Sequence, residues 1–194
     1  MRALTFRTFG DSSVLHYEEY PTPEIKSNEE LIEMKAIGLN FADIYRRKGN
    51  YHLEGTPPYL LGYEGSGIIT QIGAAVTDLQ VGQRVAFADV PNANAEFVAA
   101  PVDKVIPLPD FVSYETAASV LLQGLTAHYL TRDSYTIRPK DLVLVHAAAG
   151  GVGQLLTQIV RLHGAIPIGL TSSTKKADIA KQAGAEHVFL YSDN

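Results

Sequence analysis

The chain has 194 residues, 46% hydrophobic and 19% charged, a balance typical of a globular protein with a buried core and unlike that of disordered or fibrous chains. Its 16 basic and 21 acidic side chains give a net charge of −5 with no long run of one sign, which argues against partners such as nucleic acid or an anionic membrane. The absence of cysteine excludes disulfides, thiolate nucleophiles and cysteine-ligated zinc. No apolar stretch reaches the ~18–20 residues of a membrane span, and residues 1–7 contain no signal-peptide core, so we expect a cytoplasmic protein.

The first part of the sequence is rich in short β-strand patterns, which are punctuated by glycine and proline. Alternating or β-rich segments lie at residues 3–6, 31–36, 67–72, 84–87, 96–99 and 104–106. One helix is predicted over residues 40–48, with Asn40 as its N-cap and Asp43 near the positive end of the helix dipole. This part is therefore predicted to be a β-rich domain with a single short helix.

From Ser113 onward the hydrophobic period becomes that of a helix, and a long, mostly buried helix is predicted. Strand and helix patterns then alternate regularly: strand 142–146, helix 150–163, strand 166–171, helix 174–183 and strand 188–191. A βαβαβ order predicts a parallel sheet, and the continuous apolar run at residues 142–145 predicts strands that are buried on both faces. The fold class is therefore α/β with a β-rich N-terminal part.

The domain boundary is placed in the helix around residues 119–132, which gives domains 1–125 and 126–194. A doubly wound dinucleotide domain has roughly six strands, and only three are predicted here. We therefore expect either part of a longer protein or a half-domain whose exposed strand edge pairs with another chain.

A glycine-rich turn joins the first of these strands to the helix that follows it. Its sequence is His-Ala-Ala-Ala-Gly-Gly-Val-Gly, and the residues that we expect to face a pyrophosphate are Ala149, Gly150, Gly151, Val152 and Gly153. Glycines let a phosphate approach the amide groups at a helix start, where the dipole favours an anion. The pattern departs from Gly-x-Gly-x-x-Gly, and a tight turn required only by packing is the alternative.

The end of the second strand indicates which nicotinamide coenzyme is bound. An acid there would bind a free ribose 2′-hydroxyl, but the sequence is instead Thr-Ser-Ser-Thr-Lys-Lys at residues 171–176. Hydroxyl donors and two cations favour the 2′-phosphate of NADPH. The alternative is an ordinary helix cap with two solvated lysines.

Six segments together resemble the quinone oxidoreductases of the medium-chain dehydrogenase/reductase superfamily, the zeta-crystallin-like group. The matching segments are residues 40–46 (Asn-Phe-Ala-Asp-Ile-Tyr-Arg), 49–51, 61–67, 81–85, 122–127 and 147–153. The resemblance implies a GroES-like catalytic domain followed by the first half of a Rossmann domain that binds NADPH. It also implies a homodimer in the full-length protein.

The resemblance also implies roles for individual residues. Asn40, Tyr45 and Tyr51 would line the nicotinamide and substrate cleft, and Thr126 would approach the nicotinamide. Ser172, Lys176 and Tyr191 would surround the adenosine 2′-phosphate. Gln123, on the long helix, is better explained as a structural polar group.

No metal is expected. Gly62-Tyr63-Glu64 stands where zinc-dependent alcohol dehydrogenases of the same superfamily have Gly-His-Glu, and the six histidines are scattered. Without a Lewis acid the acceptor must be easily reduced, which favours an NADPH-dependent quinone reductase. Reduction of a 2-alkenal or another enone is the close alternative, and a catalytically inactive fragment or structural remnant is another.

Overall fold

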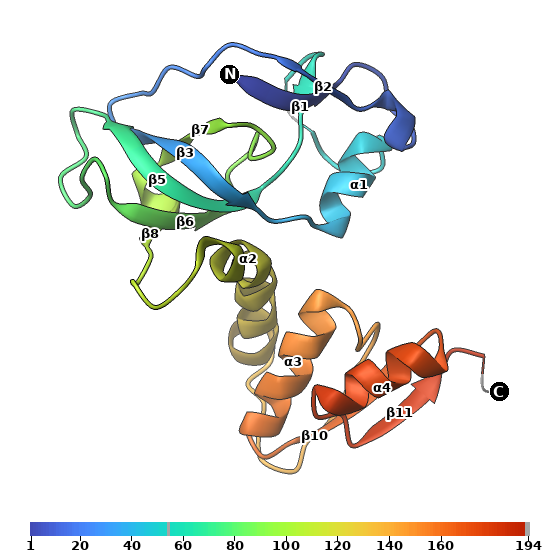
Figure 1. Cartoon of the computed structure of the whole chain (residues 1–194). Coiled ribbons are helices and arrows are strands. Elements are labelled where there is room, and N and C mark those ends of the chain that lie inside the picture. Colours follow the sequence, from blue (N-terminus) through green and yellow to red (C-terminus); the bar gives the residue numbers. More distant parts are fainter. Residues whose placement is uncertain (54, 193–194) are drawn as a thin grey trace. The chain divides into compact units, whose positions relative to one another are not determined.

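The computed structural model describes residues 1–53 and 55–192 (Figure 1). The chain divides into two compact units, Met1–Leu121 and Leu122–Asn194. The boundary expected from the sequence, after residue 125, and the boundary between these units both lie within helix α2 (Tyr114–Tyr129). Within the described residues, no helix combines the length and the apolar character that crossing a bilayer requires.

The first unit is built on a five-stranded antiparallel sheet with the strand order β7-β3-β5-β6-β8. Its strands are β3 (Glu29–Ile37), β5 (Glu64–Ile72), β6 (Arg84–Ala88), β7 (Phe97–Pro101) and β8 (Val105–Pro107). The sheet curls around a core of fully buried apolar side chains that includes Ile32, Ile69 and Phe87. This arrangement confirms the β-rich half expected from the sequence.

A second, three-stranded antiparallel sheet has the order β2-β1-β4. It is formed by β1 (Arg2–Phe6), β2 (His16–Glu19) and β4 (Tyr59–Leu60). The bridge between Ala3 and Ala95 joins this sheet to the loop that precedes β7. The sequence did not predict β2 or β4, because one is largely polar and exposed and the other has only two residues.

Short helices complete the first unit. They are η1 (Ser12–Val14), η2 (Val102–Lys104) and α1 (Phe41–Arg47). Helix α1 is bounded by Asn40 and Lys48, as its sequence predicts, and Arg46 and Arg47 lie in its last turn, where cations complement the dipole. Helix α2 begins after Ser113, whose Oγ accepts a hydrogen bond from the Thr116 amide at 3.1 Å.

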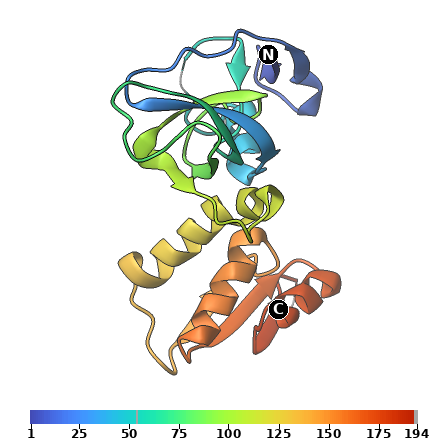
Figure 2. The same cartoon turned by 60° about the vertical axis from the view of Figure 1, so that its left-hand side comes forward.

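The second unit contains a three-stranded parallel sheet with the order β11-β10-β9. Its elements are η3 (Leu130–Ser134), β9 (Leu142–Val145), α3 (Gly151–Leu162), β10 (Ile166–Thr171), α4 (Thr174–Gln182) and β11 (His187–Leu190). Helices α3 and α4 lie side by side against this sheet (Figures 1 and 2). The predicted βαβαβ unit is therefore present.

Two burial predictions are wrong, one for the parallel sheet and one for helix α2. On β9, Val145 is buried, whereas Leu142 and Leu144 are 70% and 55% exposed, so only one face of the sheet is covered. The spatial order of the strands, β9, β10 and β11, is also their order along the chain. The crossovers through α3 and α4 therefore advance across the sheet in the same direction, and because both are right-handed they place the two helices on the same face. Helix α2 is also more exposed than predicted, with only Ala117, Ala118 and Ala127 buried along it.

Candidate functional site

The glycine-rich turn between β9 and α3 has a defined backbone geometry. Ala147 adopts a positive φ of 49°, and the Gly150 amide closes the turn by donating to the Ala147 carbonyl at 2.7 Å. Gly150 is the N-cap of α3, and its carbonyl accepts from the Gln154 amide at 2.8 Å. The turn therefore leads directly into the first residues of the helix.

Four amide groups at this turn have no acceptor among the described residues. They belong to Ala149, Gly151, Val152 and Gly153. The N–H groups in the first turn of a helix lack intrahelical partners, so the start of α3 can bind an anion. Gly150 and Gly151 are exposed, which gives an anion access from solvent.

The three glycines of the turn differ in what requires them. A Cβ at Gly153 would lie 2.4 Å from the Ala147 carbonyl oxygen and 2.8 Å from the Ala148 Cα, so packing of α3 on the turn requires this glycine. A Cβ at Gly151 would overlap only the end of a side chain, Gln123 Oε1, and one at Gly150 would meet only the Ala147 carbonyl oxygen, at 3.1 Å. At Gly153, backbone packing is by itself sufficient reason for glycine, which is the alternative that the sequence leaves open.

Ser172 and Lys176 lie together at the end of β10. The Lys176 ammonium donates to the Ser172 hydroxyl at 3.1 Å, and both residues are exposed. Ser173 caps α4, since its Oγ accepts from the Lys176 amide at 3.4 Å. A hydroxyl and a cation are thus held side by side at a second helix start, an arrangement suited to an anionic group.

Tyr191 lies against the glycine-rich turn. Its hydroxyl accepts a hydrogen bond from the Ala147 amide at 2.9 Å, and its ring stacks on His146 with centroids 6.1 Å apart. Of the three residues expected at the 2′-phosphate, Ser172 and Lys176 are therefore in direct contact with each other, whereas the Tyr191 hydroxyl bonds to the turn.

Thr126 lies on the exposed part of α2. Its hydroxyl donates to the Leu122 carbonyl of the preceding helical turn at 2.8 Å. Gln123, which we interpreted as structural, lies close to Gly151 of the glycine-rich turn. The sequence alone did not place it there, because that proximity depends on how α2 and α3 pack.

In the first unit, Asn40 links the start of α1 to β5. Its side-chain amide donates to Glu64 Oε2 at 2.9 Å, and Glu64 is fully buried. The Asn40 backbone amide donates to Asp43 Oδ2 at 3.0 Å. Asp43 is also buried, and burial raises the pKa of its carboxyl group, while the hydrogen bond from the Asn40 amide and the charge of Arg46 oppose that rise.

Arg46 contacts two tyrosine rings. Its guanidinium carbon is 3.5 Å from the centroid of the Tyr63 ring and 4.9 Å from that of Tyr51. The Nε atom donates to the His52 carbonyl at 3.2 Å, and the side chain pairs with Asp43 at 3.7 Å. Arg46, Tyr63 and Asp43 belong to the segments that carry the family resemblance, but no local pattern predicts that these three side chains meet at the site.

Tyr45 and Tyr51 are 48% and 55% exposed, so both can reach solvent or a ligand. Tyr45 contacts Phe41, the first residue of α1, with ring centroids 6.3 Å apart. Asn40, Tyr45 and Tyr51 thus belong to one short stretch, consisting of α1 and the loop that follows it.

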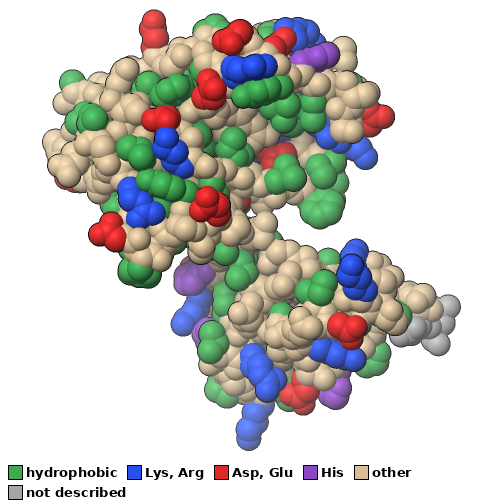
Figure 3. All heavy atoms as spheres, viewed as in Figure 1, with side chains coloured by type: hydrophobic (Ala, Val, Ile, Leu, Met, Phe, Trp, Pro, Cys, Tyr) green, Lys and Arg blue, Asp and Glu red, His purple; other side chains and the backbone are tan. Residues whose placement is uncertain are grey.

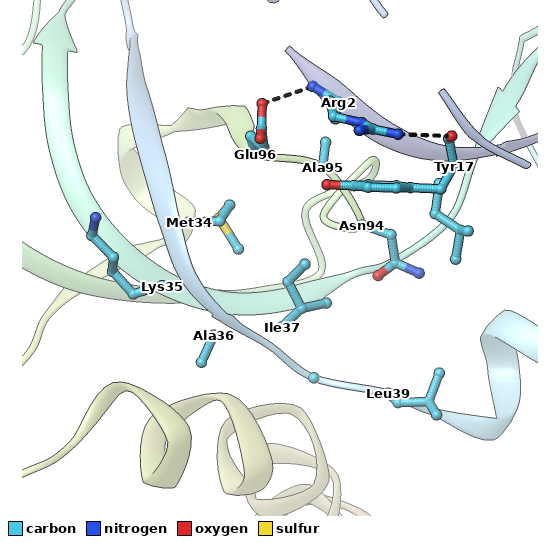
Figure 4. A pocket seen from close by; sticks show the side chains of 12 residues that line it. Arg2, Tyr17, Met34, Lys35, Ala36, Ile37, Leu39, Asn94, Ala95 and Glu96 are labelled. Carbon is cyan, nitrogen blue, oxygen red and sulfur yellow. Dashed lines mark hydrogen bonds between the residues drawn. The ribbon is translucent and has the colours of Figure 1, made fainter. Parts of the chain in front are cut away.

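A groove of about 520 Å³ opens elsewhere in the first unit, between β1 and the end of β3 (Figure 4). Arg2 lies over the ring of Tyr17 at 4.2 Å on one side, and Ile37 and Leu39 line the other. None of the residues expected at the site lines this groove.

The charges and potential metal ligands are dispersed. On the face shown in Figure 3, acidic and basic side chains are interspersed. Among the described residues, no three His, Asp or Glu side chains come together in a way that could hold a metal ion.

The family of the alcohol dehydrogenase GroES-like domain matches residues 26–110. A quinone oxidoreductase of Pseudomonas aeruginosa is 41% identical over 192 residues, which are 98% of this chain and 59% of that protein. The crystal structure of Escherichia coli quinone oxidoreductase complexed with NADPH superimposes with a TM-score of 0.96 at 37% identity, covering 100% of this chain and 60% of that one. The chain is a homologue of quinone oxidoreductases. This similarity confirms the resemblance carried by the sequence motifs. The chain spans about 59% of the length of the Pseudomonas aeruginosa relative.

Another homologue has a different name. A 2-haloacrylate reductase of a Burkholderia species is 37% identical over 162 residues, which are 81% of this chain and 49% of that protein. The relatives of this quinone oxidoreductase homologue therefore include a protein named for reduction of a 2-haloacrylate.

Proposed function

We propose that this chain is the catalytic and coenzyme-binding part of an NADPH-dependent quinone oxidoreductase that works without zinc. The observation that carries the proposal is the pair of anion sites in the second unit. One is formed by the unpaired amides at the start of α3 and the other by Ser172 and Lys176. The first would hold the pyrophosphate that NADH and NADPH share, and the second the 2′-phosphate that distinguishes NADPH. The proposal assigns residues 1–125 to the catalytic domain and 126–194 to the coenzyme domain.

The residues fit the coenzyme on structural grounds. Gly150 and Gly151 are exposed, and only the end of the Gln123 side chain lies close to Gly151, so a diphosphate can reach the open amides after that side chain rotates. The Ser172 hydroxyl can donate a hydrogen bond to a 2′-phosphate, and Lys176 provides a positive charge. The segment between these two residues contains no acid that would repel the phosphate. On the family resemblance, we assign Tyr191, whose hydroxyl bonds to the Ala147 amide of the turn, to the 2′-phosphate end of the coenzyme and Thr126 to the nicotinamide end.

Bound NADPH would supply a hydride. The chain's own contribution to the reaction is to stabilise the negative charge that develops on the acceptor oxygen. The Tyr45 and Tyr51 hydroxyls and the Asn40 amide are hydrogen-bond donors of the kind that serve this purpose. A quinone spreads that charge over a conjugated ring, so neutral donors suffice where a simple carbonyl needs a Lewis acid. A tyrosine at position 63 supports the zinc-independent assignment.

The second candidate is reduction of an enone or 2-alkenal, and the similarity to a 2-haloacrylate reductase favours it. The same donors can stabilise the enolate oxygen that forms when an unsaturated carbonyl accepts a hydride. Assay of NADPH oxidation with a series of quinones and a series of enones distinguishes the two. Turnover of quinones supports the first assignment, and turnover confined to enones replaces it with the second.

Coenzyme preference tests the anion sites without requiring turnover. In titration calorimetry, Lys176→Ala is expected to weaken NADPH binding by about tenfold or more, because it removes a charge-assisted hydrogen bond, and to leave NADH binding unchanged. Lys181→Ala is the matched control, since Lys181 is an exposed lysine in the last turn of the same helix. Equal binding of NADPH and NADH by the parent chain would remove the basis of the proposal.

Two further assignments accompany the proposal. We place the protein in the cytoplasm, which agrees with its composition, and we assign it a homodimeric state. Subcellular fractionation and analytical ultracentrifugation test them.

A further inference from the structure

We infer that Arg46 is a positioning residue that fixes the orientation of the Tyr51 and Tyr63 rings for binding of a quinone. The inference rests on the proposed function, which places Tyr51 beside the substrate. It goes beyond that function because it assigns the orientation of the aromatic groups to a residue that does not itself react.

The guanidinium group is held from several directions. Asp43 pairs with it at 3.7 Å, and only 2% of the Asp43 side chain is exposed. The Nε atom donates to the His52 carbonyl at 3.2 Å, which ties the loop after α1 to the helix. The Arg46 side chain itself is 12% exposed, so its position is determined by the protein rather than by solvent.

The fixed guanidinium in turn orients two rings. A planar cation within about 6 Å of an aromatic centroid is attracted to the ring face. Tyr63 at 3.5 Å and Tyr51 at 4.9 Å both meet this condition, one preceding β5 and the other on the loop after α1. Tyr51 is 55% exposed, so the rest of the protein restrains it little, and the contact with Arg46 limits how its ring and hydroxyl can turn.

Arginine suits this place better than lysine. Only a planar guanidinium can stack on aromatic rings while its Nε donates sideways to a carbonyl. Arg46→Lys therefore keeps the charge beside Asp43 but loses the planar contact, whereas Arg46→Met keeps the chain length and loses the charge. Arg47→Met is the matched control on the same helix, since Arg47 contacts the Gly10 carbonyl and neither tyrosine ring.

The first test is a double-mutant cycle on quinone reduction that combines Arg46→Met with Tyr51→Phe. Arg46→Met alone is expected to raise the quinone KM by about tenfold, without changing the KM for NADPH. If Arg46 acts through the Tyr51 hydroxyl, the same substitution changes KM far less in the Tyr51→Phe background. Equal effects in both backgrounds would overturn the inference and leave Arg46 a purely structural role.

The second test does not depend on turnover. In NMR spectra of the chain with labelled tyrosine, Arg46→Met is expected to shift the ring signals of Tyr51 and Tyr63, assigned by Tyr→Phe substitution, and to leave that of Tyr17 unchanged. Unchanged Tyr51 and Tyr63 signals would overturn the inference. If Arg46→Met does not fold, Arg46→Lys takes its place in both tests, with smaller changes in the same direction. Absence of quinone turnover by the parent chain refutes the proposed function, and the NMR result still decides whether Arg46 orients the rings.

Discussion

Glu30 is a buried carboxylic acid in the core of the first unit. It lies on β3, its side chain is fully buried, and neither carboxylate oxygen has a hydrogen-bond partner among the described residues. Burial raises its pKa from an ordinary value near 4.5 to about 7, and the charges of Glu29 and Asp103 add to that rise. At neutral pH this single group therefore opposes folding of the sheet that carries it.

The raised pKa predicts how stability changes with pH. The folded state binds the Glu30 proton more tightly than the unfolded state, so the protonated form stabilises the fold below pH 4.5, and this contribution is lost as the pH rises through about 7. The expected loss is about 3 kcal/mol. Glu30→Gln carries no titrating proton, so its stability relative to the parent chain should increase steadily between pH 5 and pH 8. Hydrogen exchange of β3 and β5 amides measures this difference, and Glu33→Gln on the same strand, a partly exposed residue paired with Lys35, should show little of it.

Residue identity alone predicted part of the candidate site. The N-cap position of Asn40 and the hydroxyl–cation pair of Ser172 and Lys176 could be anticipated because each depends on neighbours within a few residues. The contacts of Arg46 with Tyr63 and of Gln123 with Gly151 could not, because each joins segments whose approach is set by loops and helix packing. Local chemistry is readable from sequence, whereas contacts between distant segments require the fold.

At the scale of elements, the turn before α3 predicts an ordered series of glycine substitutions. Gly153→Ala is expected to destabilise the second unit by about 1–3 kcal/mol, because the added Cβ would overlap backbone atoms of Ala147 and Ala148. Gly151→Ala should cost much less stability, because only the end of Gln123 must move. Gly124→Ala in α2 meets no atom within 4 Å and is expected to stabilise the helix by about 0.5–1 kcal/mol. Denaturant unfolding of the three variants checks the order, and a Gly153→Ala chain as stable as its parent would contradict the packing argument.

The strands show how far periodicity determines elements. Segments with strong alternation or apolar runs formed strands close to the predicted positions, as β3 and β9 do. The predicted strand at 104–106 is partly η2, and β8 begins at Val105. Strands β2 and β4 are held by pairing with β1 rather than by their own pattern, so they were not predictable from the sequence. The local sequence pattern determines whether a segment forms a strand or a helix. Whether a short or polar segment such as β2 or β4 forms a strand at all depends on the neighbouring strand that it pairs with.

At the scale of the whole molecule, the sequence correctly indicated two regions of different class but not how the parallel sheet is covered. An apolar run such as Leu-Val-Leu-Val at residues 142–145 is typical of a strand with helices on both faces. Which face a helix covers depends on strand order, and the order β11-β10-β9 places α3 and α4 on the same side. The apolar pattern therefore predicted that both faces of the strand can be buried. It did not predict which face is covered by helices within these 194 residues.

The uncovered face predicts the solution behaviour of a chain of this length. Leu142 and Leu144 on β9, together with Phe189 on β11, expose apolar side chains on a sheet in which β9 pairs with β10 alone among the described strands. Contiguous exposed apolar surface and open strand edges favour association between molecules. The double variant Leu142→Lys with Leu144→Lys is therefore expected to lower both dye binding to exposed apolar surface and the concentration-dependent mass seen in sedimentation. Leu162→Lys on α3 is the control, because Leu162 is 84% exposed but lies outside this sheet face, so removing it should change neither measurement. Equal effects of the double variant and the control would mean that the sheet face is not the surface through which the chain associates.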